Sequence, residues 1–160
     1  MLRHLVLALS IFGASAVNAS AGQLCQTTLP VNPAFVPPAP YAQQPQPGNF
    51  WYGSSKLWTQ LPIDGTWRPA TSDGTFKTKL VFYQQGFDWR AHQPKPGLIL
   101  TARRLDGEAP AVAIDNAQAA FVTTKTPAIM VGLGLPTPGC WRITAFYDGA
   151  ALDFVVSVTR

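Results

Sequence analysis

The sequence predicts an all-β protein, an immunoglobulin-like β-sandwich of about seven strands that carries a proline-rich strap at its N-terminus. Two observations lead to this prediction. Short runs of alternating apolar and polar residues follow one another along most of the chain, separated by turn sequences, and no long run has the 3.6-residue period of a helix. The clearest pair of runs closes the chain, where an Asp-Gly turn joins them.

The first 21 residues have the features of a secretory signal peptide. Arg3 and His4 precede a mostly apolar run from Leu5 to Val17, and Ala19-Ser20-Ala21 supplies an A-x-A cleavage site. An amphipathic first helix is the alternative, and the apolar run is too short to span a bilayer comfortably. We expect cleavage after Ala21 to leave a soluble mature chain that is secreted or periplasmic, with neither a lipid anchor nor a stable membrane insertion.

Cys25 and Cys140 are the only two cysteines of the protein. In an oxidising compartment a single pair is most simply a disulfide, and this one would tie the mature N-terminus to the last two strands. Two free buried thiols are the alternative. Two cysteines fall short of a usual metal ligand set, and we predict neither a metal nor a cofactor.

Residues 22–48 are predicted to form the strap that precedes the sandwich domain, residues 49–160. Seven of the fifteen prolines lie between Leu29 and Gly48. Such a segment cannot lie inside a sheet and prefers extended polyproline II geometry. It is either a strap laid over the domain or a mobile leader, and the tether at Cys25 favours the strap. A proline-rich ligand for a partner domain is a further alternative.

The segment from Asn49 to Trp67 holds three of the five tryptophans. Leu57, Thr59 and Leu61 alternate with more polar positions and predict a strand. Exposed aromatic rings can stack on sugars or on a partner surface, which gives four candidate ligand-binding residues. The alternative, which we favour, is that these aromatics fill the core and cover its edge. The four candidates are Phe50, Trp51, Tyr52 and Trp58.

The middle of the chain predicts three further strands. Alternation runs from Phe76 to Phe82, with Lys77 and Lys79 on the opposite, outer face. It also runs from Leu98 to Ala102, and residues 128–136 form a strand interrupted by two glycines. The connection from Phe87 to Gly97 is expected to be a loop or an edge strand. A helical turn is expected only around Asn116 to Ala120, because alanine and glutamine favour one.

The last two strands have a register that the sequence itself predicts. If Tyr147 faces Ala150 around the Asp148-Gly149 turn, apolar residues meet on one face and mostly polar residues on the other. A slip by one residue would mix both faces. The predicted apolar pairs are Ala145 with Leu152, Ile143 with Phe154 and Trp141 with Val156.

The composition argues against several function classes. The 12 Lys and Arg are scattered, so the net charge of +4 indicates a solvated surface and not a nucleic-acid site. After signal removal the chain has one histidine, His92, and one glutamate, Glu108, and it contains no G-x-S-x-G motif and no phosphate-binding glycine loop. Prolines near Asp88 and His92 oppose a helix that would align the two side chains. We therefore predict that the protein is not an enzyme.

Five short motifs are similar to those of a group of uncharacterised exported bacterial proteins. The similarity spans nearly all of the mature chain, and its strongest element is the Gly-Cys-Trp strand near the C-terminus. That group usually continues with an acidic residue and then Thr-Gly, where this chain has Arg142 to Ala145. The resemblance implies an immunoglobulin-like β-sandwich and linked cysteines, and it brings no established activity or catalytic residue. The motifs are Cys25-x-Thr27-x-x-Pro30, Lys56-Leu57-Trp58-Thr59 with Asp64-Gly65, Arg103-Arg104-Leu105-Asp106-Gly107, Pro136-x-Pro138-Gly139-Cys140-Trp141 and Leu152-x-Phe154-Val155-Val156-x-Val158.

These observations predict a non-catalytic envelope or extracellular domain. We expect it to recognise a protein, or to act as a structural accessory, through a sheet face or an edge strand. A carbohydrate-binding module that uses the Phe50 to Trp58 aromatics is the alternative, in which case the partner is a polysaccharide. A secreted peptidase inhibitor that presents the Phe87 to Gly97 connection is a weaker alternative.

Overall fold

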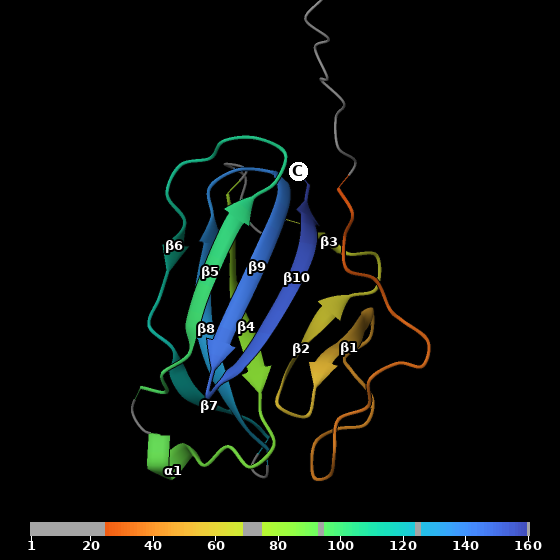
Figure 1. The fold of residues 1–160 in the computed structure, drawn as a ribbon, viewed down its shortest axis with the longest axis vertical. Helices are drawn as coiled ribbons and strands as arrows, with labels where there is room; N and C mark the ends of the chain where they lie inside the picture. The colour runs from red at the N-terminus through yellow and green to blue at the C-terminus, as the bar shows by residue number, and fades with distance from the viewer. Residues whose placement is uncertain (1–24, 69–74, 93–94, 124–125, 160) are drawn as a thin grey trace, which may run out of the picture.

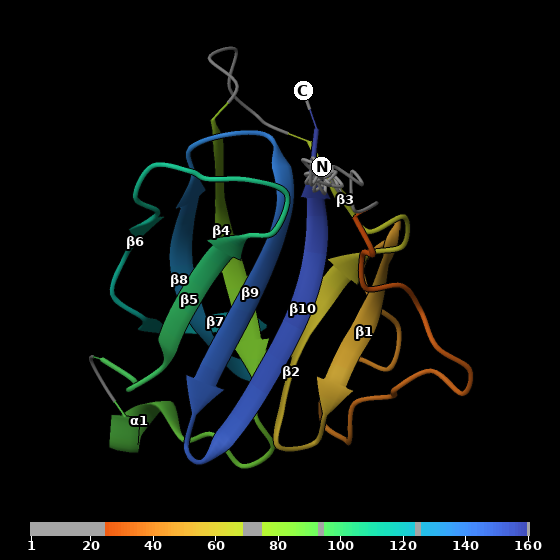
Figure 2. The same cartoon turned by 45° about the horizontal axis from the view of Figure 1, so that its top comes forward.

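A computed structural model of the chain describes residues 25–68, 75–92, 95–123 and 126–159, and it is an all-β sandwich of two sheets (Figure 1). The predicted signal peptide, residues 1–21, lies outside the described residues. In Figure 2 the sheet that holds the last two strands lies in front of the middle strands of the other sheet, and the chain between Cys25 and Gly48 runs along the right-hand side. No helix among the described residues is long and apolar enough to cross a membrane.

Sheet A has the strand order β1-β2-β4-β8-β6, and β7 also pairs with β8. Sheet B has the order β3-β10-β9-β5. All pairs are antiparallel except that of β3 with β10. The strands of sheet A are β1 (Asn49–Ser54), β2 (Leu57–Pro62), β4 (Phe76–Tyr83), β6 (Ala113–Ile114), β7 (Gln118–Thr123) and β8 (Thr126–Leu135), and those of sheet B are β3 (Thr66–Trp67), β5 (Ile99–Arg104), β9 (Gly139–Tyr147) and β10 (Ala150–Val158).

If β1, β3 and β7 are set aside, the order of the remaining strands can be compared with that of an immunoglobulin-like sandwich. In such a sandwich one sheet holds strands A, B, E and D and the other holds C, F and G. Here β2-β4-β8-β6 and β5-β9-β10 occupy the corresponding places. The two-sheet sandwich is thus confirmed, and the immunoglobulin-like assignment stays a prediction.

The predicted terminal hairpin is confirmed in its register. Tyr147 pairs with Ala150 around the turn, and Asp148 has a positive φ of 46° there. The inward-facing residues of both strands are buried in the core between the sheets. The observed pairs include Ala145 with Leu152, Ile143 with Phe154 and Trp141 with Val156.

A disulfide joins Cys25 to Cys140 at the start of β9, with the two Cα atoms 5.4 Å apart. It closes a loop with a sequence separation of 115 residues. Disulfides persist in oxidising compartments, so this link indicates a protein that matures outside the cytoplasm.

The proline-rich segment packs on the sandwich at two further points. The Thr28 N–H donates to the Val155 carbonyl (2.8 Å) and the Val155 N–H donates to Thr28 Oγ1 (2.9 Å), which holds the segment against β10. Further along, the buried Tyr41 side chain donates a hydrogen bond from its hydroxyl to the Gln84 carbonyl (2.7 Å). Residues 25–48 therefore lie over the domain as a strap.

Two sequence-based expectations are wrong. Residues 89–92 form a one-turn helix, α1 (Trp89–His92), where prolines were expected to oppose one. The Asp88 carboxylate accepts from the Arg90 N–H (2.8 Å) as an N-terminal cap, and the prolines follow the helix and so do not interrupt it. The stretch expected to hold a helical turn is instead the strand β7, because its pairing with β8 outweighs the helix propensity of Ala119 and Ala120.

Candidate binding groove on sheet A

The four aromatic residues singled out from the sequence do not form an exposed platform. Phe50 lies in the core between the sheets. Trp51 and Trp58 point to the outer face of sheet A, but there the strap covers them, and Trp58 is 0% exposed. The half-buried Tyr52 donates from its hydroxyl to the Asp153 carbonyl of sheet B (2.9 Å).

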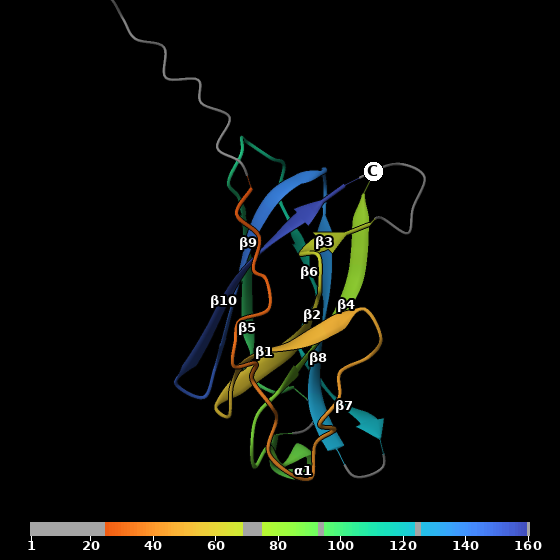
Figure 3. The ribbon, with the colours of Figure 1, turned by 90° about the vertical axis from the view of Figure 1, so that its right-hand side faces the viewer.

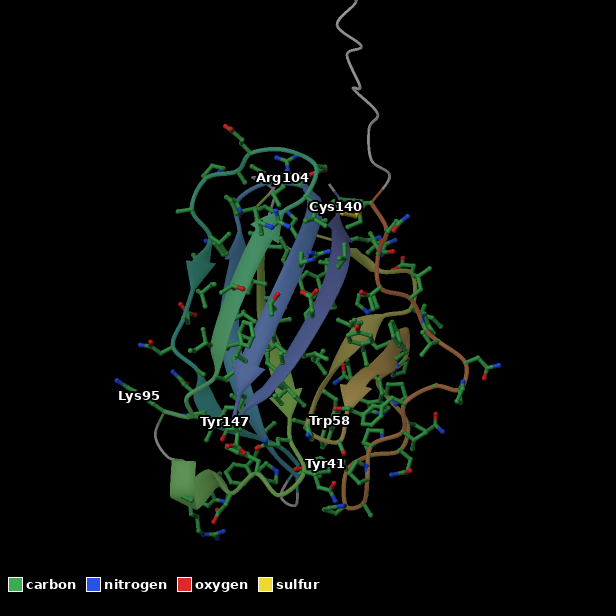
Figure 4. All side chains as sticks on the ribbon, viewed as in Figure 1. Tyr41, Trp58, Lys95, Arg104, Cys140 and Tyr147 are labelled. Atoms are coloured by element: carbon green, nitrogen blue, oxygen red, sulfur yellow. A yellow bond between two sulfur atoms is a disulfide. The ribbon has the colours of Figure 1, made fainter. Side chains whose placement is uncertain are left out.

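The strap and sheet A share a second, outer core of aromatic rings. Tyr41 contacts Trp58 edge to face, with ring centroids 4.9 Å apart, and Phe35 contacts the same indole at 5.8 Å. Trp58 and Tyr83 are stacked 5.9 Å apart. Figure 4 labels Tyr41 and Trp58, which lie close together at the strap side of the molecule.

Three neighbouring depressions on sheet A share lining residues, and we name them together the sheet A groove. The first, about 340 Å³, lies between the strap and Tyr83. The second, also about 340 Å³, lies between β2 and β4, and it shares Gln60 and Tyr83 with the first. The third, about 450 Å³, lies over β4 and β8 and shares Thr78 and Lys79 with the second.

The second depression exists because β2 and β4 are only partly paired. Their register covers two residue pairs, Trp58 with Tyr83 and Thr59 with Phe82, whereas β4 pairs with β8 from Phe76 to Phe82. In the side view β1 and β2 run obliquely across β4 (Figure 3). We name the space beyond the last pair, between the end of β2 and residues 76–81 of β4, the seam.

The backbone of β4 presents unpaired polar groups to the seam. The Val81 carbonyl accepts from Thr59 Oγ1 (2.8 Å), so the backbone groups of Val81 point toward β2. In a strand the groups of residues two apart point to the same edge, which places the N–H and C=O of Lys77 and Lys79 on that edge too. Among the described strands, none pairs with this edge of β4 before Phe82.

The two faces of the seam differ in chemistry. On the inner side, Trp67 and Phe76 are stacked with ring centroids 5.0 Å apart, beside Thr78 and Leu80. On the outer side, Lys77 and Lys79 are exposed. The seam is therefore apolar toward the core and cationic toward solvent.

Two glycines form the floor of the third depression. Gly132 and Gly134 are the register partners of Lys79 and Lys77. Because the two glycines have no side chains, Asp115 and Ala113 lie directly on the backbone of β8. The Asp115 carboxylate rests on Gly132, where a Cβ atom would clash with it. Lys77, Lys79 and Asp115 are thus the charged side chains among the described residues that line the groove.

Burial raises the pKa of Tyr41 and of Tyr83, and for Tyr83 the neighbouring Tyr41 adds to the effect. Both phenols are therefore protonated and uncharged at neutral pH. With two lysines and one aspartate, the lining of the groove has a net positive charge, and its positive groups lie on β4.

Three of the five motifs quoted from the sequence, those that contain Cys25, Arg104 and Cys140, meet at the disulfide end of the sandwich, where Figure 4 labels Arg104 and Cys140. Arg104 Nε donates to Asp106 Oδ1 (2.7 Å), and both atoms lie so close to Gly139 that a side chain there would clash. Trp141 Nε1 donates to the Thr137 carbonyl (3.1 Å). These contacts hold the loops after β5 and before β9 against the ends of those strands, which is a structural role.

Apart from Trp51, which lines the first depression, the residues of the groove were not singled out from the sequence as functional. Lys77 and Lys79 were assigned only to the outer face of a strand. The glycines at 132 and 134 gave a usable signal, since a glycine inside a strand often marks a close backbone approach. No feature of the sequence near Thr59 predicts that β2 separates from β4 after this residue.

Comparisons with protein-family models, with curated proteins and with solved structures found no significant match for this chain. Among the described residues there is also no group of three or more His, Cys, Asp or Glu side chains placed to hold a metal ion. The groove is therefore the candidate functional site of the described residues.

Proposed function

We propose that this protein is a non-catalytic, exported binding module that recognises another protein through the sheet A groove. The observation that carries the proposal is the edge of β4 in an accessible groove, with which no described strand pairs before Phe82. Buried or half-buried backbone N–H and C=O groups are almost always hydrogen-bonded, and an unpaired strand edge is a template for another chain.

Export is supported by two independent features. The sequence of residues 1–21 has the three parts of a secretory signal peptide. The Cys25–Cys140 disulfide fits an oxidising compartment such as the periplasm or the exterior of the cell. The partner is accordingly an envelope or extracellular protein.

A binding role is favoured over catalysis by the lining of the groove. The described residues that line it include neither a histidine nor a cysteine, and their one carboxylate, Asp115, rests on Gly132. The pairing of a nucleophile with a base, on which covalent catalysis depends, is not found in that lining.

The two alternatives from the sequence have less support. A carbohydrate module would need exposed rings, and Phe50, Trp51 and Trp58 are buried. An inhibitor would present the Phe87 to Gly97 connection, but Phe87 is buried, residues 89–92 form α1 and residues 93–94 lie outside the described residues.

Site-specific photo-crosslinking in the producing cells tests the proposal. A benzoylphenylalanine at position 79 is expected to form an adduct with one protein species, and the same residue at position 95 is not. Lys95, labelled in Figure 4, is exposed in the loop before β5 and is not among the residues that line the groove. Mass spectrometry of the adduct identifies the partner and its bound segment. Absence of a position-79 adduct beyond the position-95 background, or an adduct with polysaccharide, would reject the proposal.

A further inference from the structure

We propose that the seam accepts an extended segment of the partner, which adds as a β-strand to the open edge of β4 and places acidic side chains opposite Lys77 and Lys79. This inference rests on the proposed function and specifies how the groove binds. Strand addition to an exposed sheet edge is a recurring mode of peptide recognition, in which main-chain hydrogen bonds provide affinity and alternate side chains provide specificity.

The topology keeps β2 from closing the seam. Four residues after Pro62, the chain enters β3, which pairs with Ser157 and Val158 of the opposite sheet. The Gly65 carbonyl accepts from the Ser157 N–H (2.9 Å) and so anchors this crossing. Pro62 at the end of β2 has no N–H to donate to a neighbouring strand. The end of β2 is therefore drawn toward sheet B, and the β4 edge stays open.

The length of the open edge suits one short strand. Residues 76–81 of β4 are bonded to β8 on one side and have no strand partner among the described residues on the other. Most strands in globular proteins have about five or six residues. A segment of that length would satisfy the backbone groups of Lys77 and Lys79.

The alternation of side chains along β4 specifies the alternation in the partner. Residues that face each other across paired strands lie on the same side of the sheet. Partner residues opposite Lys77 and Lys79 therefore point to the outer, cationic side, where carboxylates fit. Their neighbours point inward, toward Thr78, Leu80 and the Trp67–Phe76 stack, where apolar side chains fit. The expected segment thus alternates apolar and acidic residues.

A synthetic probe tests this alternation. The probe is a fluorescent peptide with three Val-Glu repeats between Gly-Ser flanks, and its control has the same composition with the valines and glutamates in separate blocks. The repeat peptide is expected to bind the mature protein at least about tenfold more tightly than the block peptide in fluorescence anisotropy. In NMR spectra of the isotopically labelled protein, the amide signals of Lys77 and Lys79 are expected to shift the most.

Substitutions at position 79 distinguish the contribution of the Lys79 backbone N–H to peptide binding from the contribution of its side-chain charge. Lys79→Pro removes an N–H that faces the seam and leaves the bonds to β8 intact, so binding of the repeat peptide is expected to be lost. Lys79→Gln keeps the N–H and is expected to weaken binding by about three- to tenfold. Lys79→Glu is expected to weaken it further, whereas Lys95→Glu, the same change outside the groove, leaves it unchanged.

N-methylated peptides provide the same test if Lys79→Pro does not fold. Only every second N–H of an added strand points to β4. Methylating one alternate set of peptide nitrogens is expected to abolish binding, and methylating the other set is expected to change it by less than about threefold.

Equal binding of the repeat and block peptides, or equal effects of both methylation patterns, would overturn strand addition. If the position-79 crosslink then still captured a protein, the proposed function would stand without this mode of binding. If polysaccharide fragments shifted the amide signals of Lys77 and Lys79 and the peptides did not, both the proposed function and strand addition would be wrong.

Discussion

Trp58 of β2 and Tyr83 of β4 are register partners whose rings stack 5.9 Å apart at an angle of 15°, one residue pair before the two strands separate. Tyr41 of the strap lies against both rings, 4.9 Å from Trp58 and 5.9 Å from Tyr83. The closed end of the seam is thus fixed by a packed aromatic cluster. The strap stabilises that cluster and therefore also the position at which the strands diverge.

Tyr41→Ala is expected to destabilise the protein by about 3 kcal/mol, because it removes a 7% exposed ring from the outer aromatic cluster. Tyr41→Phe, which loses only the hydrogen bond to Gln84, is expected to cost about 1 kcal/mol. Urea unfolding followed by tryptophan fluorescence measures both. Val36→Ala is the control, since Val36 is 56% exposed and its loss should stay within about 0.5 kcal/mol. A Tyr41→Ala protein as stable as this control would show that the strap does not contribute to global stability.

Removing the disulfide by the double substitution Cys25→Ser and Cys140→Ala is expected to cost about 3 to 5 kcal/mol. A cross-link over about 100 residues restricts the unfolded chain strongly, although strain and residual structure reduce the gain. The measurement compares guanidinium unfolding of the wild type and the variant, with and without a reducing agent. Reduction should destabilise only the wild type. An unchanged midpoint for the double variant would contradict the prediction.

Asp106→Asn is expected to remove a pH-dependent part of the stability. Partial burial acts to raise the pKa of Asp106, but hydrogen bonds from Arg104 and from the Cys140 backbone outweigh it, and the pKa lies below the ordinary value of 3.8. A carboxyl group with a lowered folded pKa stabilises the fold above its unfolded pKa, and this contribution is lost as the pH falls through the folded pKa.

The unfolding free energies of wild type and Asp106→Asn are therefore expected to differ by less than about 1 kcal/mol at neutral pH, after solvent screening, and to converge below about pH 3.8. Urea unfolding at a series of pH values measures the difference. A gap that stays constant with pH would show that Asp106 acts through packing and not through its charge.

Gly132→Ala is expected to destabilise the wild type by about 1 kcal/mol, because the new Cβ would clash with the Asp115 carboxylate. In an Asp115→Ala background the same change is expected to stabilise by about 0.5 kcal/mol, since alanine loses less backbone entropy than glycine in a strand. A double-mutant cycle on thermal unfolding measures the coupling. Additive effects of the two substitutions would contradict a clash between a side chain at position 132 and the Asp115 carboxylate.

The sequence by itself determined the class of fold, the terminal hairpin and its register, and the cysteine pair, because these depend on period-two patterning, turn chemistry and the number of cysteines. It also placed Lys77 and Lys79 on the outer face of β4. The fold class, the hairpin and the face of the two lysines follow from residues that are neighbours in the chain. The disulfide follows from the cysteine count, because two cysteines allow only one pairing.

Only the tertiary structure decided what covers each face and where each strand ends. Trp58 points away from the central core and is nevertheless buried, because the distant Phe35 and Tyr41 pack on it. Residues 118–123 form a strand because β8 pairs with them. The seam opens because β3 pairs with β10, about 90 residues further along the chain. Periodicity shows which side chains share a face, but contacts between distant segments determine whether that face is covered, paired or left open.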